Sequence, residues 1–254
     1  MDRIGIIDIG SNSVRLVIID IKENRAHHQI EHLEESVRLR SGTDFRGSLT
    51  EEGMAYATET VSLFVTFCKA RRVEHIIAVA TAAVRRAPNG QELVRRIQQE
   101  TGIKTTILSG EEEAYLGYLG LINSVTEPSG LMADLGGGSL KLVSFANRLN
   151  QNTVALDLGG VSLMEEFDLE DLPTKENLRN LEAYLDEAFG QIPWLQEQPN
   201  VIGLGGTFRS LARVYRNHVQ YVPDITDGIV IPTEAVGEIY SMLSKMDAEQ
   251  RRKV

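Results

Sequence analysis

The sequence predicts an α/β protein built from two related lobes, and three observations carry this prediction. Apolar, β-branched runs alternate with segments of helical character along most of the chain. A pattern of strand, glycine turn and strand near the start occurs again after Pro128. The length of 254 residues suits one large or two small domains.

The first lobe, expected over residues 1–124, begins with three strands joined by short turns. Such neighbours should pair as antiparallel or mixed strands. Thr50 is a fair N-cap for the helix that follows them. In order, we expect strands at 4–10, 14–21 and 26–35, a helix at 50–71, a strand at 74–81, a helix at 90–101, a strand at 103–108 and a helix at 110–123.

The second lobe, expected over residues 125–254, repeats this beginning and then stops early. After its fourth strand it offers helices only, so it lacks a fifth strand and a closing helix. We therefore expect a C-terminally incomplete lobe whose sheet has an exposed edge. In order, we expect a strand and glycine turn at 130–139, strands at 140–146 and 152–159, a helix at 174–189, a strand at 200–206, and helices at 207–216 and 233–244.

The two beginnings form an internal repeat with an offset of 126 residues. With this shift, residues 7–17 face residues 133–143, and five of the eleven facing pairs are identical. A basic residue, Arg15, faces another basic residue, Lys141. The alternative is a pair of unrelated hairpins that share common turn residues.

The two glycine turns are candidate phosphate loops. A turn rich in glycine and serine directs several backbone N–H groups at one point, and such arrays bind phosphate. Asp8 and Asp134 precede the turns, and a carboxylate repels phosphate, so each would bind a divalent cation or activate water. For each turn alone, a plain hairpin is the alternative. The candidate phosphate ligands are Ser11, Asn12, Ser13, Gly136, Gly137, Gly138 and Ser139.

A third glycine turn lies between a strand and a helix, where a helix N-terminus favours anions. Its candidate residues are Gly205, Gly206 and Thr207. The dinucleotide fingerprint GxGxxG fits this turn poorly, and the absence of any Gly-Lys pair excludes a P-loop. The sequence of residues 157–160 is similar to the start of the second glycine turn, and we interpret this stretch as a tight turn rather than a site.

Two further stretches carry charges that suit a phosphate site. Arg85 and Arg86 follow a predicted strand, and they either face solvent or hold phosphate. Ser109 is a candidate N-cap, followed by the acidic residues 111–113. These acids either complement the helix dipole or include a general base for water.

Composition excludes several classes of function. The chain has 26 basic and 36 acidic residues, a net charge of −10, which argues against a general binder of nucleic acid or of acidic membranes. A polyanionic ligand requires that Arg15, Arg85, Arg86 and Lys141 gather. One cysteine, Cys68, excludes an intrachain disulfide and is expected to be buried. We find neither a membrane-length apolar run nor a signal peptide, and we expect a reducing cytoplasm.

Five stretches together resemble the exopolyphosphatase and guanosine pentaphosphate phosphatase family (Ppx/GppA), and the resemblance extends over the whole chain. It implies two actin-like (ribonuclease H-like) lobes with the active cleft between them. It also implies removal of a terminal phosphate from inorganic polyphosphate, or of the 5′ γ-phosphate from guanosine pentaphosphate, with Mg²⁺, and a homodimer. The stretches are IDIGSNSVRL, VATAAVRRAPN, ILSGEEEAYLGYLG, DLGGGSLKLV and GLGGTFRSLA.

The resemblance also implies a role for each candidate residue. Asp134 resembles the aspartate that holds metal, with Asp8 as its counterpart in the first lobe, and Glu113 resembles the base that activates water. Arg85 or Arg86 resembles the arginine that holds phosphate. The residues that resemble phosphate-binding turns are Ser11, Asn12, Ser13, Gly136, Gly137, Gly138, Ser139, Gly205, Gly206 and Thr207.

Three departures from the family pattern matter. Lys141 stands where the family has an acid, so it would weaken a cation site or contact phosphate itself. Tyr115 replaces an arginine near Glu113, and family members continue past the residue matching Val254. The alternative to a phosphatase is therefore a catalytically impaired relative that binds polyphosphate or an alarmone nucleotide as a sensor. An actin-like ATPase or kinase is a third possibility, which residues 111–113 disfavour.

Overall fold

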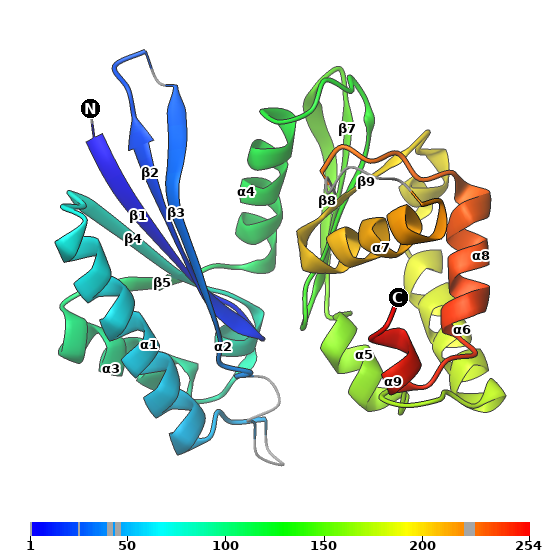
Figure 1. Ribbon diagram of the computed structural model, residues 1–254, viewed down its shortest axis with the longest axis horizontal. Coiled ribbons are helices and arrows are strands. Elements are labelled where there is room, and N and C mark those ends of the chain that lie inside the picture. Colours follow the sequence, from blue (N-terminus) through cyan, green and yellow to red (C-terminus); the bar gives the residue numbers. More distant parts are fainter. Residues whose placement is uncertain (1, 25, 40–42, 44–46, 221–226) are drawn as a thin grey trace. The chain divides into compact units, whose positions relative to one another are not determined.

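The computed structural model, shown in Figure 1, describes residues 2–24, 26–39, 43, 47–220 and 227–254. It consists of two compact units, residues 1–113 and 114–254. Both units are α/β, which confirms the predicted fold class. No described helix is both long enough and apolar enough to cross a bilayer.

The first unit is built on a five-stranded sheet in the order β3-β2-β1-β4-β5. β1 to β3 pair antiparallel, as expected for strands joined by short turns, while β4 and β5 continue the sheet in parallel. The strands are β1 (Asp2–Ile9), β2 (Ser13–Ile21), β3 (His27–Ser36), β4 (His75–Ala80) and β5 (Thr105–Ile107). The helices are α1 (Glu51–Ala70), α2 (Ala82–Arg86) and α3 (Gly90–Thr101).

The core of the first unit forms where alternate residues of β1 and β2 meet α1 and α3. Ile7, Ile9 and Leu16 are fully buried, and they belong to one cluster with Val61 of α1 and Ile97 of α3. Both helices lie on the same face of this sheet in Figure 1. Thr50 caps α1, as predicted, because its side chain accepts the Gly53 N–H at 3.2 Å.

Cys68 lies in this core with no exposed surface, which confirms the expectation that it is a buried apolar residue. Burial raises the pKa of its thiol, and the thiolate is the reactive form. We therefore expect the native protein to react with a disulfide reagent about 100-fold or more slowly than the protein in urea. Absorbance after addition of such a reagent measures both rates. Equal rates in buffer and in urea would contradict the buried position.

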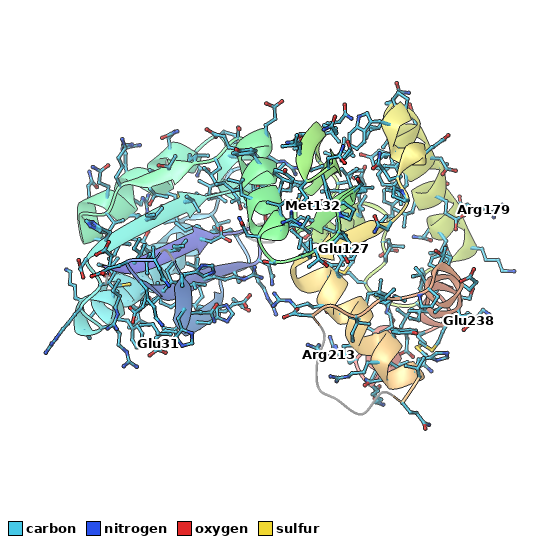
Figure 2. All side chains as sticks on the ribbon, turned by 90° about the horizontal axis from the view of Figure 1, so that it is seen from above. Glu31, Glu127, Met132, Arg179, Arg213 and Glu238 are labelled. Atoms are coloured by element: carbon cyan, nitrogen blue, oxygen red, sulfur yellow. The ribbon has the colours of Figure 1, made fainter. Side chains whose placement is uncertain are left out.

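The boundary between the units falls within α4 (Gly110–Ile122), earlier than the expected boundary after Ser124. From Ala114 onward the helix packs on the second sheet, because Ala114, Tyr118 and Leu121 form one apolar stripe. This stripe forms a core cluster with Met132 and Phe145. Figure 2 labels Met132, which lies among the side chains of the second unit and is fully buried.

The second unit is built on a four-stranded sheet in the order β8-β7-β6-β9, with β9 parallel to β6. In this order β9 lies at one edge of the described sheet. The strands are β6 (Gly130–Leu135), β7 (Leu140–Ala146), β8 (Leu149–Leu156) and β9 (Val201–Leu204). The helices are α5 (Gly160–Glu166), α6 (Lys175–Gly190), the 3-10 helix η1 (Pro193–Glu197), α7 (Gly205–His218), α8 (Thr233–Leu243) and α9 (Ala248–Arg251).

The third strand of this unit begins three residues earlier than predicted, and the turn before it explains why. Asn147 and Arg148 both have positive φ, 50° and 60°. Two such residues in succession form the tight turn whose twist suits a β-hairpin. β8 therefore starts at Leu149 and pairs with β7 at once.

The internal repeat is present in the backbone of both units. Asp8 pairs with Arg15 across β1 and β2, and Asp134 pairs with Lys141 across β6 and β7. The first glycine of each turn donates its N–H to a serine carbonyl at 2.9 Å. The register shifts once between the second and third strands, at Ile18/Ile19 in one unit and Ser144/Phe145 in the other. Since these shifts are 126 residues apart, as the turns are, the two hairpins are a true structural repeat rather than a coincidence of turn residues.

Candidate phosphate-binding and catalytic residues

The turn between β1 and β2 is held by two backbone hydrogen bonds, one within the turn and one from the segment that follows β3. The Gly10 N–H donates to the Ser13 carbonyl at 2.9 Å, and the Asn12 carbonyl accepts the Arg38 N–H at 2.8 Å. Ser11 and Ser13 are buried, whereas Asn12 is exposed. Of the three residues predicted here as phosphate ligands, Asn12 therefore has the most accessible side chain.

Ser13 and Arg15 both bind Glu34, a residue of β3 that the sequence analysis did not single out. The Ser13 hydroxyl donates to Glu34 Oε1 at 2.6 Å, and Arg15 Nε lies 3.1 Å from the same oxygen. The signal in the sequence was weak, because Glu34 is one of several acids in an exposed strand and only the strand register brings it opposite Arg15.

The hydrogen bond from Ser13, followed by the Arg15 guanidinium, holds the pKa of Glu34 below its usual 4.5, against the opposing effect of burial. A lowered pKa means that Glu34 adds stability above its unfolded pKa, and that this is lost as the pH falls through the folded pKa. Ser13→Ala is therefore expected to raise the pKa of Glu34. It should also reduce the loss of stability below pH 4.5. NMR titration of the Glu34 carboxyl carbon measures the shift.

Ser241→Ala, on an exposed site of α8, is the control and should leave the Glu34 titration unchanged. A Glu34 pKa that stays the same in Ser13→Ala would show that the hydrogen bond does not cause the shift.

Glu113 is distinguished from its two acidic neighbours by its partner. Ser109 and Glu112 cap α4 reciprocally: the Glu112 N–H donates to Ser109 Oγ at 3.1 Å, and the Ser109 N–H donates to Glu112 Oε2 at 2.8 Å. Glu111 is exposed. Helix capping therefore accounts for Glu112, and it does not account for Glu113.

Arg85 of α2 holds the Glu113 carboxylate. Its Nη1 donates to Glu113 Oε2 at 3.2 Å and to the Leu108 carbonyl at 2.8 Å. Both side chains are mostly buried, with 22% and 16% exposed. Arg86 follows on the same short helix and is half-buried. Arg85 thus fixes the position of Glu113, while Arg86 is the adjacent candidate for phosphate.

The glycine turn of the second unit rests on the start of α5. The Gly160 and Val161 N–H groups donate to the carbonyls of Gly136 and Gly137, each at 2.9 Å. A Cβ on Gly159 would lie 2.3 Å from the Gly137 carbonyl oxygen and 2.4 Å from Gly138 backbone atoms. The stretch 157–160, interpreted above as a tight turn, therefore begins a helix and supports the candidate phosphate loop. The two adjacent glycines were the available signal.

Asp134 and Lys141 meet at this turn. Lys141 is 3% exposed, and its Nζ lies 4.0 Å from Asp134 Oδ2. Nζ would also lie 3.8 Å from a Cβ on Gly136, so the ammonium is next to the turn. Ser139, two residues before Lys141 in the chain, is also buried. Of the four cations that a polyanion site would gather, Arg15, Arg85 and Arg86 belong to the first unit and Lys141 to the second.

The third glycine turn begins α7 and contacts Asp134. Gly205 has φ +86°, and a Cβ there would lie 2.9 Å from Asp134 Oδ1, so this position requires glycine. Gly206 has open space where a Cβ would be. The Thr207 hydroxyl donates to the Leu135 carbonyl at 2.9 Å, which ties the start of α7 to the end of β6.

The residues around Asp134 do not fit the divalent cation that the resemblance implies. Mg²⁺ selects carboxylate, carbonyl and water oxygens, and an ammonium beside the carboxylate repels it. Lys141 provides such an ammonium 4.0 Å from Asp134 Oδ2. Among the described residues, no group of three or more His, Cys, Asp or Glu side chains could hold a metal ion.

Comparison with known proteins decides the family. The model of the Ppx/GppA phosphatase family matches residues 6–254. The chain belongs to this family. The matched region contains both glycine turns, the Arg85–Glu113 pair and the Asp134–Lys141 pair described above.

Two curated relatives of this Ppx/GppA chain are mycobacterial. Exopolyphosphatase 1 of Mycobacterium tuberculosis H37Rv is 29% identical over 218 residues, which are 84% of this chain and 63% of that protein. Exopolyphosphatase 1 of Mycobacterium leprae is 28% identical over 84% of this chain and 64% of its own length. The chain thus spans a little under two thirds of the length of these relatives.

Solved structures of the family share the fold. A Ppx/GppA family member of Aquifex aeolicus superposes with a TM-score of 0.83 at 28% identity, covering 99% of this chain and 82% of that one. An exopolyphosphatase of Cytophaga hutchinsonii gives a TM-score of 0.88 at 27% identity, covering 97% of this chain and 81% of that one. These matches confirm the expected actin-like fold class.

Proposed function

We propose that this Ppx/GppA chain releases the terminal phosphate from inorganic polyphosphate. One observation carries the proposal. Arg85 holds the Glu113 carboxylate in place, and Glu113 is not the acid that pairs with Ser109 in the cap of α4. Similarity to proteins named exopolyphosphatases supports polyphosphate as the substrate. Guanosine pentaphosphate, the other substrate that the family resemblance implies, is a second candidate.

The proposed chemistry is an in-line transfer of the terminal phosphoryl group to water. Glu113 orients the water and accepts its proton as the water oxygen bonds to phosphorus. The bridging P–O bond breaks, and the shortened chain leaves with that oxygen. Backbone N–H groups of the first glycine turn and the Arg86 guanidinium stabilise the charge on the transferring group. Arg85 acts through Glu113 and is therefore a positioning residue.

Phosphate release from long-chain polyphosphate and from guanosine pentaphosphate, each with and without Mg²⁺, tests this proposal. We expect release from polyphosphate, in proportion to enzyme concentration. Release from the nucleotide alone would transfer the proposal to that substrate. If phosphate is released from neither substrate, the proposal of hydrolysis is wrong and binding alone is left as the function.

A sensor that binds polyphosphate or an alarmone nucleotide without hydrolysing it is the second candidate. Lys141 beside Asp134 favours it, because this pair leaves less room for a catalytic cation. Tight binding of tripolyphosphate without turnover would support a sensor. A homodimer and a cytoplasmic location, expected above, remain predictions.

A further inference from the structure

Lys141 is unusual because its charge is buried. In the described part of the chain, only Asp20 and Lys141 are buried charged residues, and lysine is rarely buried without an anionic neighbour. Asp20 accepts two hydrogen bonds from Arg3, at 2.7 and 3.0 Å. Lys141 has a carboxylate neighbour in Asp134, whose Oδ2 lies 4.0 Å from the Lys141 Nζ.

The repeat shows what differs between the two units at this position. Arg15, the counterpart of Lys141, faces Glu34 on the third strand and pairs with it at 3.1 Å. On the third strand of the second unit, the residue that faces Lys141 is Ala155. The cross-strand carboxylate that accompanies the base in the first unit is therefore replaced by a methyl group in the second.

We propose that the Lys141 ammonium is the resident cation of the second glycine turn, and that it binds phosphoryl oxygens of a polyphosphate directly, in place of a divalent cation. The inference rests on the proposed function for its ligand. The ammonium lies beside the turn formed by Gly136, whose backbone can approach a phosphate closely. A lysine ammonium binds phosphate as a point charge. It also balances the charge of Asp134, which would otherwise repel the ligand.

Binding of sodium tripolyphosphate, measured by calorimetry on the full chain, tests the proposal. The wild type should bind at least as tightly in EDTA as in Mg²⁺, since complexation by Mg²⁺ lowers the negative charge of the probe. Lys141→Met should weaken binding by about 10- to 100-fold, the value of a hydrogen bond to a charged group. Lys175→Met, at an exposed lysine in the same unit, is the control and should bind like the wild type.

Lys141→Glu provides a second test, so that the proposal can still be contradicted if Lys141→Met does not fold. It places two carboxylates opposite each other across β6 and β7, and oxygen ligands of this kind bind divalent cations. We expect this variant to bind Mn²⁺ in an electron paramagnetic resonance titration, and the wild type to bind it at least tenfold more weakly. Circular dichroism and thermal unfolding check the folding of each variant.

Three outcomes would overturn the proposal: wild-type binding that is lost in EDTA and restored by Mg²⁺, Lys141→Met binding like the wild type, or tight Mn²⁺ binding by the wild type. Its failure is separable from that of the proposed function. Binding in EDTA without phosphate release supports the lysine cation and contradicts hydrolysis, whereas Mg²⁺-dependent binding with release does the reverse. A probe that binds in neither buffer contradicts both.

Discussion

Glu113→Gln is expected to lower the rate of phosphate release from polyphosphate by about 10²- to 10⁴-fold, the contribution of a well-placed general base. Glutamine keeps the size of the side chain and can still accept from Arg85, but it cannot take a proton from water. The effect should appear in kcat with little change in KM. Initial rates of phosphate release over a range of polyphosphate concentrations measure both constants.

Glu111→Gln is the matched control for this prediction. Glu111 lies two residues earlier in the same helical turn and is exposed, so the variant removes an equal charge without touching the Arg85 partner. It should keep wild-type kinetics. A Glu113→Gln protein that is folded and fully active would eliminate Glu113 as the base, whatever the control shows.

Gly159→Ala is expected to destabilise the second unit by about 1–3 kcal/mol and to weaken tripolyphosphate binding. The added Cβ would lie 2.3–2.4 Å from backbone atoms of Gly137 and Gly138, so the candidate phosphate loop must move. Backbone strain is not the cause, because Gly159 has an ordinary extended conformation with φ −127°. Urea unfolding, followed by circular dichroism, measures the change in stability.

Gly160→Ala tests whether the clash, rather than the loss of a glycine, is responsible. The nearest atom to a Cβ on Gly160 is the Gly136 carbonyl oxygen at 3.9 Å, an ordinary contact. Alanine should therefore be tolerated at this first helical position and should leave binding intact. If both variants unfolded at the same urea concentration as the wild type, the packing of α5 against the loop would not matter.

The local features of this protein could be predicted from its sequence. The spacing of apolar residues indicated the strands of both hairpins and most of the helices, and the shared Asp8 and Asp134 pattern indicated the repeat. The glycine turns were visible because their chemistry depends on residues adjacent in the chain. Three short helices, α2, α5 and the 3-10 helix η1, were missed because helices of 5 to 7 residues have too little periodicity to detect.

The position of the boundary between the two units could not be predicted from the sequence either. The periodic stripe on α4 was detectable, but only packing shows which sheet the stripe covers. Because Ala114 and Tyr118 cluster with Met132 and Phe145, the helix belongs mainly to the second unit.

What the sequence by itself determined was the fold class, the repeat and the set of candidate residues, since these depend on local order along the chain. Only the tertiary structure decided which candidates act together. It separated Glu113 from Glu112 by pairing Glu113 with Arg85, 28 residues away in the chain. It also directed Lys141 into the glycine turn beside Asp134. Such partners are chosen by strand register and burial, which bring together residues that no spacing rule connects.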